Sequence, residues 1–155
     1  MSEEVIQSKI MVIRGKKVIL DKDIALLYEV KPIALRQQVN RNTDRFPEDF
    51  MFILGEAELV AMVSQNVIPS RKYFGGSLPY VFTEQGIAML SSVLTSKRAV
   101  YVNIQIMRTF AKLREITKSD LINRKIYCQL LQITNIPRRE EILCPFKSDF
   151  KSLSP

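Results

Sequence analysis

The hydrophobic positions between residues 21 and 46 recur twice with the period of an α-helix, once on each side of a proline. In the first segment the apolar stripe consists of Ile24, Ala25, Leu27 and Tyr28. Pro32 disfavours helical geometry at Lys31 and suits the first position of a new helix. The pattern therefore predicts a helix with Asp21 as its N-cap, a short turn, and a second helix.

The second predicted helix, residues 32–43, has an inner and an outer side when its residues are placed about 100° apart. Leu35 and Val39 define the inner side. The outer side carries Ile33, Gln37, Asn40 and Arg41, with Arg36 on its flank. Exposed helices usually prefer Glu and Lys, whereas this side has no Glu and has Asn, which is a poor helix former. The composition favours a recognition surface over the alternative of a plain solvent-exposed helix.

These side chains are suited to reading DNA. Arg, Asn and Gln make bidentate contacts to guanine and adenine in the major groove, and an apolar side chain can pack on a thymine methyl. The residues expected to contact bases are Ile33, Arg36, Gln37, Asn40 and Arg41. Lys31 and Arg45, at the two ends, are placed to contact phosphates. The order helix, turn, helix matches the helix-turn-helix plan, in which the first helix braces the second.

Short strands and further helices are predicted on either side of this segment. Residues 10–20 contain two β-type runs around Gly15, which predict a hairpin. Residues 50–54 alternate in a way that predicts a strand buried on both faces. Residues 56–65 predict a helix whose inward residues are Leu59, Val60 and Val63.

The segment from residue 66 to residue 82 is rich in Pro, Gly and Ser. Its β-compatible stretches flank Gly75 and Gly76, which indicates a hairpin or a flexible wing. In that case Arg71 and Lys72 would contact a phosphate backbone. The alternative is an ordinary surface loop.

The later part of the chain is predicted to be helical. Thr83 is a credible N-cap for a helix over residues 84–94, and Ser96 for a longer helix over residues 97–115. The longer helix has a stripe formed by Ala99, Val102, Ile106, Phe110 and Leu113, widened by Val100, Ile104 and Met107. A stripe that broad indicates a core on one side and a partner, such as a second copy, on the other. Residues 118–133 predict a further helix, and residues 134–155 a poorly ordered tail.

Composition and charge favour binding over catalysis. The net charge is +7, and basic segments before residue 46 and after residue 95 flank an acidic middle, which suits a polyanion such as nucleic acid. The chain has no His, which removes the usual general base and makes a zinc site with Cys128 and Cys144 improbable. We therefore expect no metal, no cofactor and no enzymatic activity.

A metal-dependent nuclease is the catalytic alternative. Its carboxylates would be Asp21, Asp23, Glu48 and Asp49. Helix caps and an acidic turn explain these residues better. The acidic N-terminus has no apolar signal core, and no run is long enough to span a membrane, so a cytoplasmic protein is expected.

Two long runs carry a resemblance to a known family. They are IRGKKVILDKDIALLYEVKPIALRQQVNRNTDRFPEDFMFIL and SLPYVFTEQGIAMLSSVLTSKRAVYVNIQIMRTFAKLRE. Over roughly residues 9–116 the chain resembles the phage-type ORF-six N-terminal domain, which is related to the KilA-N and Bro-N domains of bacteriophages, prophages and large DNA viruses. RFPEDFMF and FTEQGIAMLSSVL are the most specific parts of the match.

The resemblance implies a small α+β domain that binds duplex DNA in antirepressor-like phage regulatory proteins, without enzymatic activity. Its presumed DNA-contacting segment corresponds to the second helix, so Arg36, Gln37, Asn40 and Arg41 carry over by position. The expected organisation is a lead-in of residues 1–8 and a domain of residues 9–117. In that domain short strands pack on several helices, including a helix-turn-helix and a long C-terminal helix. The alternative is a protein-interaction module that sequesters a repressor or forms a homodimer through helix 97–115.

Overall fold

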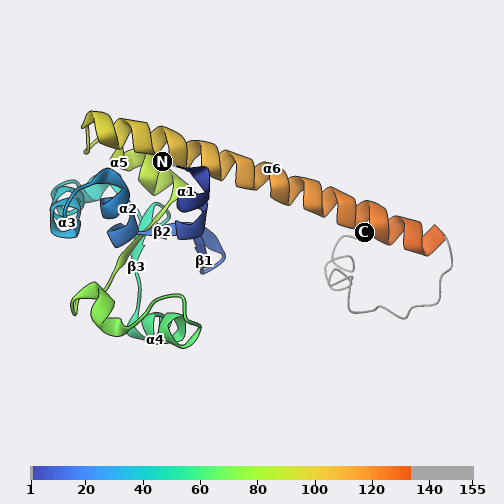
Figure 1. Ribbon diagram of the computed structural model, residues 1–155, viewed down its shortest axis with the longest axis horizontal. Coiled ribbons are helices and arrows are strands. Elements are labelled where there is room, and N and C mark those ends of the chain that lie inside the picture. Colours follow the sequence, from blue (N-terminus) through green and yellow to red (C-terminus); the bar gives the residue numbers. More distant parts are fainter. Residues whose placement is uncertain (1, 134–155) are drawn as a thin grey trace. The chain divides into compact units, whose positions relative to one another are not determined.

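The computed structural model describes residues 2–133, and within this range the strands form a four-stranded antiparallel sheet (Figure 1). Its order is β1-β2-β4-β3. The strands are β1 (Met11–Ile13), β2 (Lys16–Leu20), β3 (Met51–Ile53) and β4 (Tyr80–Thr83). The predicted hairpin around Gly15 is therefore confirmed as β1 and β2, with Gly15 at a positive φ of 72°. An α+β fold, as predicted, results from this sheet and its helices.

The sheet is buried on both faces, because adjacent residues of β2 and β4 point to opposite sides. Ile19 and Phe82 enter one hydrophobic core together with side chains from the helices α2, α3, α5 and α6 defined below. Val18, Leu20 and Val81 enter a second core with residues of α4 and the loop after it. In β3 the prediction of burial on both faces is wrong for Ile53, which is 46% exposed.

The two helices predicted after the hairpin are α2 (Asp21–Tyr28) and α3 (Pro32–Arg41), and Pro32 opens α3 as expected. A short 3-10 turn, η1 (Thr43–Arg45), follows α3. One detail of the prediction is wrong: the N-cap position of α2 is Leu20, and Asp21 is the first helical residue. The Asp21 carboxylate is bonded instead to Arg36 of α3 and to the N–H of Lys22.

The helix after β3 and the loop before β4 each differ from the prediction in one way. Helix α4 (Glu56–Ser64) buries Leu59 and Met62, whereas Val60 is 60% exposed because it lies about 100° around the helix from Leu59. The loop before β4 forms the 3-10 turn η2 (Arg71–Phe74) and not a hairpin, because β4 pairs with β2 and β3. Buried Ile68 and Phe74 fix this loop to the second core.

Helix α5 (Glu84–Leu90) ends four residues before the predicted end at residue 94. Thr83 is its N-cap, as predicted, since its side chain accepts from the N–H of Gly86 at 3.4 Å. The N–H of Thr83 also donates to the carbonyl oxygen of Phe50 at 3.0 Å. A Cβ added at Gly86 would lie 2.0 Å from that same oxygen, so this position requires Gly. The two specific motifs, RFPEDFMF and FTEQGIAMLSSVL, therefore contact each other at Phe50.

Two helices complete the described chain. The lead-in folds as α1 (Glu3–Lys9), which buries Ile6 in the first core. Helix α6 (Lys97–Ile133) runs without a break through Lys118, where the sequence favoured a boundary. The compact unit formed by residues 1–110 includes the start of α6, whose buried apolar residues are Ala99, Val102, Ile106 and Phe110, as predicted. Ser96 accepts a hydrogen bond from the N–H of Ala99 at 3.1 Å, as expected of its N-cap.

The rest of the chain forms a second unit, residues 111–155. The tail predicted over residues 134–155 lies outside the described residues. Among the residues described, no helix is both long enough and apolar enough to cross a membrane.

Candidate functional site

The turn between α2 and α3 is closed by backbone hydrogen bonds. The N–H of Val30 donates to the carbonyl of Ala25 at 3.0 Å, and that of Glu29 to the carbonyl of Leu26 at 3.2 Å. This pairing is the Schellman motif, whose left-handed position is usually Gly and here is Glu29, with φ 58°. Arg98 of α6 contacts the same turn, bonding to the Glu29 carboxylate at 3.2 Å and the Leu27 carbonyl at 3.2 Å. The angle between the helices is therefore fixed by several contacts.

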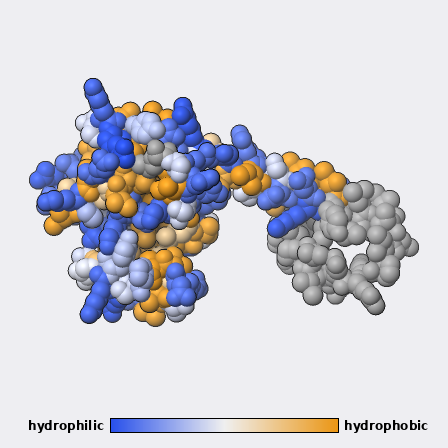
Figure 2. Space-filling model, in the orientation of Figure 1, coloured by the Kyte–Doolittle hydropathy of each residue, from blue (hydrophilic) through white to orange (hydrophobic). Residues whose placement is uncertain are grey.

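The inner and outer sides of α3 are as the periodicity predicted. Leu35 and Val39 are fully buried in the first core. On the outer side Ile33 is 64% exposed, and Gln37, Asn40 and Arg41 are exposed. Figure 2 shows hydrophilic residues interspersed with hydrophobic ones over the edge of the molecule where α3 lies. The structure therefore brings these four predicted base-contacting residues together on one accessible surface.

Arg36 has a different environment from the other predicted base-contacting residues. Its Nε donates to Oδ2 of Asp21 at 2.5 Å, and the Asp21 side chain is completely buried. Its guanidinium carbon lies 5.2 Å from the centre of the Tyr80 ring, within the range of a cation–π contact. Arg36 is only partly exposed. Its contacts with Asp21 and Tyr80 join α3 to α2 and to β4.

Asn40 is attached to the sheet by a hydrogen bond. The Tyr80 hydroxyl donates to Oδ1 of Asn40 at 3.2 Å, although the two residues are 40 positions apart in sequence. Tyr80 is the first residue of β4 and packs against the first core. This role could not be predicted from the sequence, because a single Tyr next to Pro79 in a loop-like segment has no periodic context.

The residues predicted to contact phosphates are all exposed, but two have protein partners. Arg45 donates to the hydroxyl of Ser92 at 2.9 Å. Arg71 pairs with Glu56 at 2.6 Å, with both side chains more than half exposed. Lys31 and Lys72 are exposed. Phosphate contact by these four residues stays a prediction.

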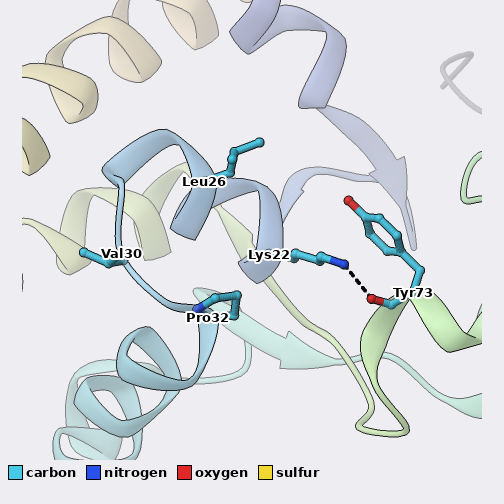
Figure 3. Close-up of a pocket in the computed structure, with 5 residues that line it drawn as sticks. All are labelled: Lys22, Leu26, Val30, Pro32 and Tyr73. Carbon is cyan, nitrogen blue, oxygen red and sulfur yellow. Dashed lines mark hydrogen bonds between the residues drawn. The ribbon is translucent and has the colours of Figure 1, made fainter.

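Lys22 links α2 to the loop that carries Arg71 and Lys72. Its Nζ donates to the backbone oxygen of Tyr73 at 2.6 Å and lies 3.3 Å from the centre of the Tyr73 ring. Figure 3 shows Lys22 extending from α2 towards Tyr73, where both residues line a pocket. The pocket is lined by Lys22, Leu26, Val30, Pro32 and Tyr73. The loop is thus held against the start of α2.

Two of the four carboxylates considered for a nuclease form ion pairs with neighbouring basic side chains. Asp21 is paired with Arg36, and Asp23 lies 3.0 Å from the ammonium group of Lys9. Within residues 2–133 there is no group of three or more His, Cys, Asp or Glu side chains arranged to hold a metal ion.

One buried polar contact was not expected from the sequence. The Tyr28 hydroxyl donates to Oδ1 of Asn103, which joins α2 to α6. Burial raises the pKa of Tyr28 well above its ordinary value, so the hydroxyl stays protonated and remains a donor. Asn103 Nδ2 is buried without a hydrogen-bond partner in the described part of the chain. Both residues have apolar helical neighbours, and periodicity alone does not separate a buried polar residue from an exposed one.

Comparison with known proteins agrees with the resemblance seen in the sequence. A search of curated proteins and a search of solved structures each gave no match. A family model, the ORF6N domain, matches residues 8–93, more than half of the 155 residues. The matched range contains the sheet, α2, α3, α4 and α5. The chain therefore belongs to the ORF6N domain family, which is a phage-type family.

Proposed function

We propose that this protein is a phage-type regulatory protein that binds duplex DNA by inserting the outer side of α3 into the major groove. The observation that carries the proposal is the exposed row of Gln37, Asn40 and Arg41 above a fully buried inner side. These side chains can donate to and accept from base edges. In this role α2 braces α3, as the first helix of a helix-turn-helix does.

The roles of individual residues follow from their surroundings. Gln37, Asn40 and Arg41 contact base edges, and Ile33 packs on a thymine methyl. Lys31, at the start of α3, contacts a phosphate together with the N-terminal amides of the helix. Arg36 braces α3, because its Nε is bonded to buried Asp21. Arg45, Arg71 and Lys72 supply further phosphate contacts.

The proposal contains no catalytic step and no cofactor. Asp21 and Asp23 are ion-paired with Arg36 and Lys9, which explains their carboxylates structurally. Incubation of the protein with plasmid DNA and magnesium or manganese should leave the DNA intact. Metal-dependent cleavage would contradict this part of the proposal.

The experiment that tests DNA reading is selection of bound duplexes from a random pool by the full-length protein. We expect one sequence motif to be enriched by the wild type and lost with Gln37→Ala together with Arg41→Ala. Lys16→Ala is the matched control, because it removes one positive charge from the exposed tip of the β1–β2 hairpin. Enrichment of the same motif by all three proteins would contradict the assignment to α3.

A second candidate function is protein binding through the start of α6. Val100 and Tyr101 are each 46% exposed, and Ile104 is 45% exposed, so the helix presents an apolar surface beside its buried stripe. Exposed apolar patches favour protein partners. A second copy of the chain, or the repressor that an antirepressor would sequester, fits this surface. Sedimentation of the protein alone and with the cognate repressor would separate the two, and a monomer in both samples would contradict this function.

A further inference from the structure

The side chain that holds Asn40 comes from the sheet and not from α3. Tyr80, the first residue of β4, donates its hydroxyl hydrogen to Oδ1 of Asn40 at 3.2 Å. We propose that Tyr80 is a positioning residue that orients the Asn40 amide to read an adenine, an inference that rests on the proposed function.

The hydrogen bond leaves the Asn40 amide able to read a base. An amide oxygen has two lone pairs and an amide nitrogen has two donor hydrogens, so one lone pair and both donors remain after Tyr80 is bonded. Adenine presents an acceptor at N7 and a donor at N6, which match an amide donor and acceptor, whereas guanine presents two acceptors. A free amide rotates about its last torsion. The bond to Tyr80 favours one orientation and so lowers the entropy lost when the base binds.

The Tyr80 ring is in turn supported by Arg36, which is bonded to a buried residue. The guanidinium of Arg36 lies 5.2 Å from the centre of the Tyr80 ring, and Nε of Arg36 is bonded to the completely buried Asp21. A continuous series of contacts therefore runs from a buried carboxylate on α2, through Arg36 and Tyr80, to Asn40 on the exposed surface. This series gives Arg36 a role in recognition that needs no contact with a base.

The test uses Tyr80→Phe, which removes the hydroxyl but keeps the ring that contacts Arg36. Affinities of the full-length protein are measured for duplexes that differ at a single base pair, the one at which Asn40→Ala loses its preference. Losing one hydrogen bond should lower the preference for adenine at that position by about 3- to 10-fold. Preferences at other positions should not change. Lys16→Ala, at the exposed tip of the β1–β2 hairpin, is the control and should leave the base preference at every position unchanged.

A double-mutant cycle separates positioning from a merely structural role. In the Asn40→Ala background, Tyr80→Phe should add no further loss, and the thermal midpoint of Tyr80→Phe should stay within about 2 °C of wild type. An equal loss in both backgrounds, or no loss in either, would overturn the role of Tyr80. A preferred base pair other than adenine–thymine would overturn the assignment of the base. Failure of the wild type to prefer any duplex would be a different result, since it overturns the proposed function on which this inference rests.

Discussion

Helices α3 and α6 bury similar surfaces but expose different ones. Leu35 of α3 and Ile106 of α6 are both fully buried in the same core. The exposed side of α3 consists largely of amide and guanidinium groups, whereas α6 exposes Val100 and Ile104. Packing dictates the inner residues of both helices, so it is the outer residues that carry information about partners. This difference supports the proposals that α3 binds DNA and that α6 binds a protein partner.

Truncating a buried side chain on the inner side of α3 or of α6 should lower the free energy of unfolding by similar amounts. These substitutions should have the largest effect of those considered. Leu35→Ala and Ile106→Ala should each lower the free energy of unfolding by about 3 to 4 kcal/mol, because each leaves a cavity in the first core. Urea denaturation followed by circular dichroism measures this. A loss below about 1 kcal/mol for either variant would show that its helix does not share the core.

Within α3, the two arginines should behave differently. Arg36→Ala should lower the free energy of unfolding by about 2 to 3 kcal/mol, because it leaves the buried Asp21 carboxylate without its charged partner. Arg41→Ala should change it by less than about 0.5 kcal/mol, because Arg41 is exposed. The same denaturation experiment compares the two. Equal losses would remove the distinction between a bracing and a reading arginine.

Periodicity explains which parts of this site the sequence predicted. The inner and outer sides of α3 depend on residues within one helix, so Leu35, Val39, Gln37 and Arg41 were placed correctly from spacing alone. The same reasoning identified the buried stripe of α6. Periodicity was less informative for α4, because a short helix with many apolar residues does not show which of its sides faces the core.

The contacts that the sequence did not predict join residues distant in the chain. Tyr80 meets Asn40 across 40 positions, and Tyr28 meets Asn103 across 75. Such pairs depend on how the elements pack, which spacing along one element does not encode. The loop before β4 illustrates the same limit, because β4 pairs with β2 and β3, and neither of these strands comes from the segment predicted to form a hairpin.

Substitutions on the outer side of α6 should have a smaller effect on stability. Val100→Ser together with Ile104→Ser should change the free energy of unfolding by about 0.5 kcal/mol, because both positions are almost half exposed. If a partner covers this surface, the double substitution should shift sedimentation towards the monomer. It should leave the DNA affinity per binding site unchanged. Loss of DNA reading with retained association would reverse the assignment of the two helices.

The smallest expected effect concerns Glu58, which lies on α4 and not on α3 or α6. The side-chain hydrogen bond from Arg14, followed by that from the Gly55 N–H, lowers the pKa of Glu58. A lowered folded-state pKa contributes stability above the unfolded value of about 4.3, and this contribution is lost as pH falls through the folded value. Glu58→Gln should therefore be slightly less stable than wild type at neutral pH, with the difference vanishing in acid. Denaturation at several pH values measures it, and DNA affinity should not change.

The most direct test of the central claim is an equilibrium titration of the selected duplex and a scrambled duplex at several salt concentrations. For wild type we expect affinity to fall steeply with salt, with a log–log slope of several units, and the selected duplex to be preferred. Gln37→Ala with Arg41→Ala should abolish the preference, whereas Lys16→Ala should retain it. Equal affinity of the wild type for both duplexes, or no binding at low salt, would contradict the claim that α3 reads DNA.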